Sequence, residues 1–315
     1  MTVAFRRLLG FLAAYGIVAA LALELLFFSL RSPYFLTWEN QLNVLRQNSA
    51  VAVLAAGMTF VILSAGIDLS VGSLVALSGV TAAAALLPEW GPLALRIPAA
   101  ILAGVLVGGV LGLVNGAIVT GMRIPPFVAT LAMMTIARGI ALHATESRTI
   151  SGLPGAYGEL GTGIWPILVL LVVFGLSWVV LTRMPFGRHV YAVGGNPEAA
   201  HLCGIPVRRV LILVYSISGL LAGLAGVMVG ARLGSGYPNA GVLYELDAIA
   251  AVVVGGTSLM GGRGSVWGTL VGALVIGELN NGLNLLDVEY YTQKILIGVV
   301  LLGAAWLDRF RQERS

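Results

Sequence analysis

The segment Arg183–Arg209, RMPFGRHVYAVGGNPEAAHLCGIPVRR, organises the rest of the chain because it is the longest polar and charged stretch in a mostly apolar sequence. Arginines stand at both of its ends, and Arg123 lies in an earlier short loop. Basic residues that flank membrane spans are retained in the cytoplasm. The segment is therefore predicted to be a cytoplasmic loop between two spans.

Inside this loop the sequence predicts a short helix between Asn196 and Gly204. Pro197 suits a first helical turn, Glu198 is favourable at the positive start of a helix, and the glycine favours a stop. Two alanines follow the glutamate and leave part of the helix surface bare. We interpret this helix, which lies outside the bilayer, as a docking surface for a partner.

Composition excludes a soluble globular protein. The chain has 315 residues, of which 58% are hydrophobic and only 10% charged, with a mean hydropathy of +0.95. Soluble domains carry about 25% charged residues. The net charge of +4 does not indicate nucleic-acid binding, because the basic residues are scattered between apolar runs. The single cysteine, Cys203, excludes a disulfide framework and any cysteine-based metal site.

Ten apolar runs separated by polar turns predict a single all-α domain with about ten membrane spans, since a span needs about 20 residues. The expected spans are 8–30, 42–64, 71–87, 98–120, 127–143, 164–182, 210–231, 244–259, 265–285 and 291–307. Residues 66–70 are expected to form a cytoplasmic turn. An alternative has eight or nine spans, with a re-entrant hairpin near Asp68.

The distribution of arginines orients these spans. Eleven arginines fall on the side of the Arg183–Arg209 loop, and five fall on the other side. The group of eleven includes Arg6 and Arg7 at the start of the chain and Arg314 at its end. Both termini are therefore predicted to be cytoplasmic.

Regularly spaced glycines predict close helix packing within the membrane. Lipid offers no hydrophobic drive for helix association, so small residues that let helices approach are favoured at interfaces. The fourth span carries a four-residue ladder of glycines, and the seventh carries two close-spaced pairs. These glycines are Gly104, Gly108, Gly112, Gly116, Gly219, Gly223, Gly226 and Gly230.

Motifs of known catalytic centres are absent from the sequence. There is no phosphate-binding loop, no HExxH, no carboxylate pair placed for hydrolysis, and none of the three histidines is spaced as a paired metal ligand. The chain is therefore expected not to be an enzyme and to hold no metal. Carriers coupled to protons or sodium usually show intramembrane acids or broken helices. A transporter powered by another subunit fits the sequence better.

Four long motifs, in order along nearly the whole chain, resemble the ribose-type permease of bacterial ABC sugar importers. They are GMTFVILSAGIDLSVGSLVALSG (Gly57–Gly79), PPFVATLAMMTIARG (Pro125–Gly139), FGRHVYAVGGNPEAAHLCGI (Phe186–Ile205) and YELDAIAAVVVGGTSLMGGRGSVWGTLVGALVIGELNNGLNLL (Tyr244–Leu286). Sister permeases for xylose, other monosaccharides, nucleosides or the autoinducer-2 signal share this pattern, so the substrate is left open.

The resemblance implies a multi-pass subunit of the bacterial inner membrane that works as a pair, either homodimeric or heterodimeric. It would receive a monosaccharide from a periplasmic binding protein. Cytoplasmic ATPase subunits, which bind the ATP and Mg, would drive it, and the chain itself would hold no cofactor. The resemblance also assigns ATPase coupling to the loop helix through the pattern EAA, three residues, Gly. Its residues are Asn196, Glu198, Ala199, Ala200 and Gly204.

Asp68 and Ser70 are the most conspicuous polar pair near the bilayer. They lie at the start of the third expected span, where Asp and Ser commonly cap the exposed N–H groups of a helix. The alternative role is a gate or a partner contact.

Charged and amide side chains inside two spans mark a candidate translocation path. Arg138 and Glu278 are expected at similar depth in the outer half of the membrane, where each charge is costly, so we expect them to pair or to line a wet cavity. Near Glu278 lie Asn280, Asn281 and Asn284. Amides can bond sugar hydroxyls, and they can equally bridge helices.

Two alternative functions are weighed against an ATP-driven importer. A stand-alone secondary carrier for a sugar or nucleoside would retain uptake without ATPase subunits. An intramembrane enzyme or structural scaffold is disfavoured because the sequence shows no catalytic constellation.

Overall fold

The computed structural model describes residues 3–312, with side chains for residues 16–303 and Trp306. Within this range every regular element is a helix, apart from one isolated antiparallel bridge between Ile150 and Gly236. The helices are α1 (Val3–Arg31), α2 (Trp38–Leu63), α3 (Val71–Leu86), α4 (Leu93–Gly121), α5 (Pro126–Ala144), α6 (Gly155–Thr162), α7 (Trp165–Arg183), α8 (Pro185–Gly195), α9 (Pro197–Leu202), α10 (Val207–Leu233), α11 (Tyr244–Val254), α12 (Val266–Leu285) and α13 (Tyr290–Gln312). The side chains of Arg6, Arg7 and Arg314 lie outside the described region.

Among the described residues, five helices are long and apolar enough to cross a membrane: α2, α4, α5, α7 and α10. The whole of α3 and residues 290–303 of α13 are shorter apolar helices. The prediction of a polytopic all-α membrane protein is confirmed.

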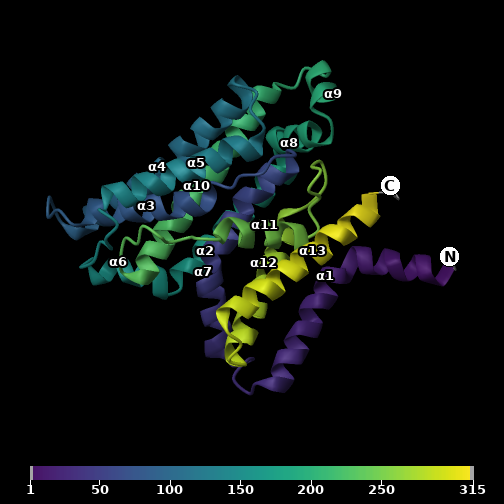
Figure 1. The fold of residues 1–315 in the computed structure, drawn as a ribbon, viewed down its shortest axis with the longest axis horizontal. Helices are drawn as coiled ribbons and strands as arrows, with labels where there is room; N and C mark the ends of the chain where they lie inside the picture. Colours follow the sequence, from purple (N-terminus) through teal and green to yellow (C-terminus); the bar gives the residue numbers. More distant parts are fainter. Residues whose placement is uncertain (1–2, 313–315) are drawn as a thin grey trace.

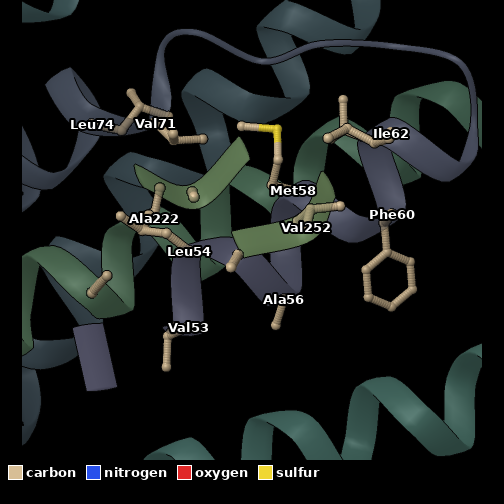
Figure 2. Close-up of a cluster of buried hydrophobic side chains, with 14 of the residues drawn as sticks. Val53, Leu54, Ala56, Met58, Phe60, Ile62, Val71, Leu74, Ala222 and Val252 are labelled. Carbon is tan, nitrogen blue, oxygen red and sulfur yellow. The ribbon is translucent and has the colours of Figure 1, made fainter. Parts of the chain in front are cut away.

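Helix α2 forms the centre of the molecule. Every residue from Ala52 to Leu63 is buried, so this helix has no lipid-facing side along that length. Figure 2 shows Val53, Met58 and Phe60 leaving the helix in different directions. A helix that is apolar all round belongs in a core. Its neighbours are α7, α10, α11 and α12.

The predicted glycine packing is confirmed where α4 meets α10. A Cβ atom on Gly108 would overlap the backbone of Gly219, and one on Gly112 would overlap the carbonyl oxygen of Tyr215. Gly226 lies against α3 in the same way, next to the carbonyl oxygen of Val75. Backbones therefore touch directly along this three-helix unit of α3, α4 and α10.

The turn expected in the cytoplasm lies inside the protein instead. Asp68 is fully buried, and its Oδ2 atom accepts a hydrogen bond of 2.9 Å from Ser218 of α10. Ser218 is eleven residues after Val207, where α10 begins, so it lies about 17 Å along the helix axis. The chain thus turns back into the bundle after α2, and α3 starts at depth.

The expected span at residues 244–259 is also wrong. Helix α11 has only eleven residues and ends at Val254, because Gly255 and Gly256 follow and Gly256 has a φ of +84°. Residues 236–241, which precede α11, are irregular chain that lies beside α3. Gly236 lies against Ala83, and Gly241 lies against Val75. The segment before α11 is therefore a run of turns, with positive φ at Gly241 and Leu243.

Two short helices that the sequence reading missed lie at opposite ends of the bundle. Figure 1 shows α6 at the left and α8 with α9 at the upper right, and both chain ends also point to the right. In α6, the buried hydroxyl of Tyr157 donates to the carbonyl oxygen of Val227 at 3.1 Å. In α8, the hydroxyl of Tyr191 donates to the carbonyl oxygen of Gly264 at 3.0 Å. Each helix is fixed to the bundle by such a contact.

The α4–α10 packing predicts that Gly112→Ala destabilises the protein. The new Cβ would force apart two backbones that now touch, at a cost of roughly 1–3 kcal/mol. The melting temperature of the purified protein in detergent should fall. The matched control is Gly175→Ala in α7, where a Cβ would meet nothing within 4 Å. This control should be neutral or slightly stabilising, and equal melting temperatures for both variants would contradict the direct backbone contact.

Candidate functional site

The loop helix α9 is built as its sequence predicts. The Oδ1 atom of Asn196 accepts a hydrogen bond of 2.9 Å from the backbone N–H of Ala199, which caps the helix start. Pro197 occupies the first turn, where its missing N–H costs nothing. The predicted helix between Asn196 and Gly204 is confirmed as a structural element.

The end of α9 depends on Gly204. Its φ is +82°, a conformation that favours glycine. The N–H of Ile205 donates to the carbonyl oxygen of Ala200 at 3.0 Å, and the N–H of Gly204 donates to that of His201 at 2.9 Å. This pattern is a Schellman cap. A Cβ on Gly204 would meet nothing within 4 Å, so the glycine is required by the backbone and not by crowding.

The two faces of α9 differ. Ala200 is only 5% exposed and belongs to the main hydrophobic core, so it anchors the helix. Glu198 and Ala199 are exposed, and Leu202 is 87% exposed. Leu202 is thus the apolar part of the outer face of α9. The sequence analysis missed Leu202, although an apolar residue in this polar loop was a visible signal.

The end of α8, which leads into α9, packs against two connecting segments of the bundle: the turn between α2 and α3, and the loop before α12. A Cβ on Gly194 would overlap the carbonyl oxygen of Leu63, the last residue of α2. That oxygen accepts a hydrogen bond of 2.9 Å from the N–H of Gly262, in the loop before α12. A Cβ on Gly261 would likewise overlap Ala65, in the turn before α3. Three chain segments therefore meet backbone to backbone beneath α9.

Asp68 organises the buried turn between α2 and α3. Its Oδ1 atom accepts from the N–H and the hydroxyl of Ser70, at 3.0 and 2.6 Å. The hydroxyl of Ser70 also accepts from the side-chain amide of Asn115 on α4, at 2.9 Å. Together with the bond from Ser218, this network joins the turn to α4 and α10. The carboxylate of Asp68 therefore bonds to Ser70, the residue before α3. The side chain of Ser70 itself makes no capping hydrogen bond to the first turn of α3.

Arg138 of α5 holds the irregular segment before α11. Its Nη1 atom donates to the carbonyl oxygens of Pro238 and Ala240, each at 2.8 Å, and its Nη2 atom lies 3.4 Å from that of Gly72. The carbonyl groups of Pro238 and Ala240 lie outside any helix, whereas that of Gly72 belongs to the first turn of α3. A guanidinium group can satisfy several of them from one side. Arg138 thus connects the two broken segments of the bundle.

The expected pairing of Arg138 with Glu278 is wrong. Glu278 is 4% exposed and accepts a hydrogen bond of 3.4 Å from Gln41 of α2, and Arg138 bonds backbone carbonyls elsewhere. A second acid that the sequence reading missed, Glu24 of α1, lies level with Glu278. Phe28, one turn after Glu24, packs on Gly282, one turn after Glu278. The sequence did carry a signal for Glu24, because it is an acidic residue inside the apolar run 8–30.

The asparagines near Glu278 do not share one environment. Asn284 is exposed, and its Oδ1 atom accepts a hydrogen bond of 2.7 Å from Gln293 of α13. It therefore bridges two helices. Asn280 and Asn281 are half-buried, and the amide nitrogen of Asn281 has no partner among the described residues. A role of these side chains in a sugar path stays a prediction.

An ion pair between α11 and α13 was also missed by the sequence reading. The Nζ atom of Lys294 lies 3.0 Å from both carboxylate oxygens of Asp247. Both groups are partly shielded from solvent, and their contact ties α13 to the short helix α11.

Among the described residues, no group of three His, Cys, Asp or Glu side chains could hold a metal ion. The polar groups inside this bundle bond backbone segments to helices.

The Asp68 network predicts different outcomes for two substitutions. Asp68→Ala leaves two buried serine hydroxyls and one N–H without their acceptor, so it should lower the free energy of unfolding by about 2–4 kcal/mol. Asp68→Asn can still accept from Ser70 and donate to Ser218, so it should cost about 1 kcal/mol or less. Thermal unfolding of the purified protein measures both. If Asn destabilises as much as Ala, the negative charge and not the hydrogen bonding is required.

Comparison with known proteins identifies the family of the chain. Residues 40–305 match the family described as branched-chain amino acid transport system / permease component. The ribose import permease protein RbsC of Haemophilus influenzae is 47% identical over 92% of this chain and 91% of that protein. The protein of the same name from Bacillus subtilis is 46% identical over 95% and 94%.

A more distant relative has a different substrate in its name. The D-allose transport system permease protein AlsC of Escherichia coli is 40% identical over 94% of this chain and 91% of that protein. No solved structure matches the chain. The match over most of the sequence and the identities near 47% show that the chain belongs to this permease family, within which it groups with the ribose-type permeases.

Proposed function

We propose that this chain is the transmembrane subunit of an ABC importer that carries a ribose-like monosaccharide across the bacterial inner membrane. It works as a pair, with a second copy or a related permease. A periplasmic binding protein delivers the sugar, and separate cytoplasmic ATPase subunits bind the ATP and Mg and supply the energy. In this proposal the whole chain is one transmembrane domain without a catalytic site or cofactor of its own.

The observation that carries this proposal is the construction of α9. It presents Glu198, Ala199 and Leu202 to solvent, and Ala200 anchors it in the core. Directly beneath it, the end of α8 contacts both the end of α2 and the loop before α12. A subunit that pushes on α9 would therefore move two membrane segments. A carrier working alone has no need for such a surface, so the arrangement favours an importer driven by a partner.

The proposed topology has ten crossings with both termini in the cytoplasm. Two of the crossings consist of a short helix and a piece of irregular chain: the turn with α3, and residues 234–243 with α11. The other eight are α1, α2, α4, α5, α7, α10, α12 and α13. Such broken spans occur in membranes where the irregular backbone is enclosed by protein.

Reporter fusions test this orientation. A reporter inserted after Pro197, or fused after Arg314, should behave as cytoplasmic, because the excess of arginines lies on that side. A reporter inserted after Gly152, in the loop before α6, should behave as periplasmic. Gly152 lies in a non-helical stretch with open space around it, so the insertion should be tolerated. A periplasmic result at Pro197 would overturn both the orientation and the assignment of α9 to the ATPase.

Substitutions on the outer face of α9 test the proposed function itself. Leu202→Ser and Glu198→Arg change exposed side chains, so the permease should insert and melt like the parent. ATP-dependent sugar uptake should fall about tenfold or more, since loss of an apolar anchor or of charge complementarity weakens an interface. ATPase retained on the purified permease, and ATP hydrolysis stimulated by the loaded binding protein, should fall with uptake.

Position 204 provides a matched control. Gly204→Asn keeps a side chain that tolerates positive φ, whereas Gly204→Val does not. The valine variant should lose coupling because the end of α9 shifts, and the asparagine variant should keep most of it.

Unchanged uptake and ATPase retention in the Leu202 and Glu198 variants would reject α9 as the coupling helix. Uptake that persists without ATP or ATPase subunits would instead favour a secondary carrier.

A further inference from the structure

A groove of about 680 Å³ opens beside α9, where α4 ends and α10 begins. Thr120 lines it from the last turn of α4, and His201 lines it from α9. The first two turns of α10 supply Arg208, Arg209 and Leu211. The groove therefore lies at one end of two helices that are long and apolar enough to span a membrane.

The polar side of this groove is positively charged. Arg208 and Arg209 are exposed, and none of the described residues that line the groove is acidic. Among the described residues neither arginine makes an ion pair, since the ion pairs there join other residues. Two adjacent guanidinium groups present donors that suit the oxygens of a phosphate group.

The groove continues into an apolar strip along the seam between α4 and α10. Leu213 is 50% exposed and Leu220 is 37% exposed on α10, and Leu113 is 52% exposed on α4. The two helices are held together along this seam, where a Cβ on Gly109 would overlap the side chain of Leu220. Positive charge at the membrane boundary thus leads directly into an apolar surface at membrane depth.

We propose that this groove and strip bind one anionic phospholipid. Its phosphate would lie in the groove beside Arg208 and Arg209, and its acyl chains would lie along the strip that begins at Leu213, one turn after Arg209 on the same face of α10. Basic pockets between spanning helices on the cytoplasmic side bind anionic headgroups in this way. An acidic protein partner would satisfy the two arginines but would leave the strip uncovered. The lipid explains the charge and the apolar surface together.

Native mass spectrometry of the purified full-length permease tests this site. With dioleoyl phosphatidylglycerol or dioleoyl phosphatidylcholine added, the parent should retain phosphatidylglycerol preferentially. The double variant Arg208→Gln/Arg209→Gln should lose that preference, with phosphatidylglycerol affinity lower by about tenfold or more, because each basic group near the surface contributes to anionic lipid binding. Both side chains are exposed, so the variant should elute as a folded permease from size exclusion.

A matched control removes the same charge nearby. Arg183 and Arg188 lie at the same end of the molecule but do not line the groove. The variant Arg183→Gln/Arg188→Gln should retain phosphatidylglycerol like the parent. Equal losses in both double variants would mean that only the net charge matters, which would overturn the site. Retention by the Arg208/Arg209 variant equal to that of the parent would also overturn it.

Two further measurements distinguish the lipid from other occupants of the groove. Glycerol phosphate, which has the headgroup chemistry without acyl chains, should not raise the melting temperature of the permease, whereas phosphatidylglycerol should. Stabilisation by glycerol phosphate alone would indicate a phosphate site and reject the lipid. If the Arg208/Arg209 variant loses ATPase and keeps lipid, the groove is part of the ATPase interface. Lipid retention is measured without sugar or ATP, so this result is independent of the proposed transport function.

Discussion

Irregular backbone inside a membrane must have its N–H and C=O groups satisfied by the protein, and this constraint shapes the centre of the structure. In the turn before α3, the carboxylate of Asp68 accepts hydrogen bonds from the backbone N–H and the hydroxyl of Ser70. In the segment before α11, the guanidinium group of Arg138 donates hydrogen bonds to the carbonyl oxygens of Pro238 and Ala240. Two ionisable side chains of the bundle, Asp68 and Arg138, therefore bond to broken segments.

The sequence predicted those features that depend on local spacing. The glycine ladder of α4 and the glycines of α10 repeat every three or four residues, so their contact follows from helix geometry and small size. The start and stop of α9 follow from Asn196, Pro197 and Gly204, which act on the backbone nearby. Such features need no knowledge of the remaining fold.

Features that depend on distant partners could not be read in this way. The apolar run 244–259 looks like one span, yet its helix ends at Val254, and the missing half comes from the chain before it. Arg138 and Glu278 were placed at equal depth by counting residues, but depth does not say which side of a helix faces which neighbour. Their actual partners, Pro238 and Gln41, belong to segments that the tertiary fold brings to them.

The same contacts suggest how force could pass from α9 into the membrane. Helices joined through direct backbone contact, as α4 and α10 are, have little room to slide, because close-packed interiors transmit strain. Beneath α9, Gly194 touches Leu63, whose carbonyl oxygen is bonded by Gly262. A displacement of α8 would therefore act at once on the turn before α3 and on the loop before α12. One of these connections reaches the turn before α3, where the helical path is interrupted, and the other reaches the loop that joins α11 to α12.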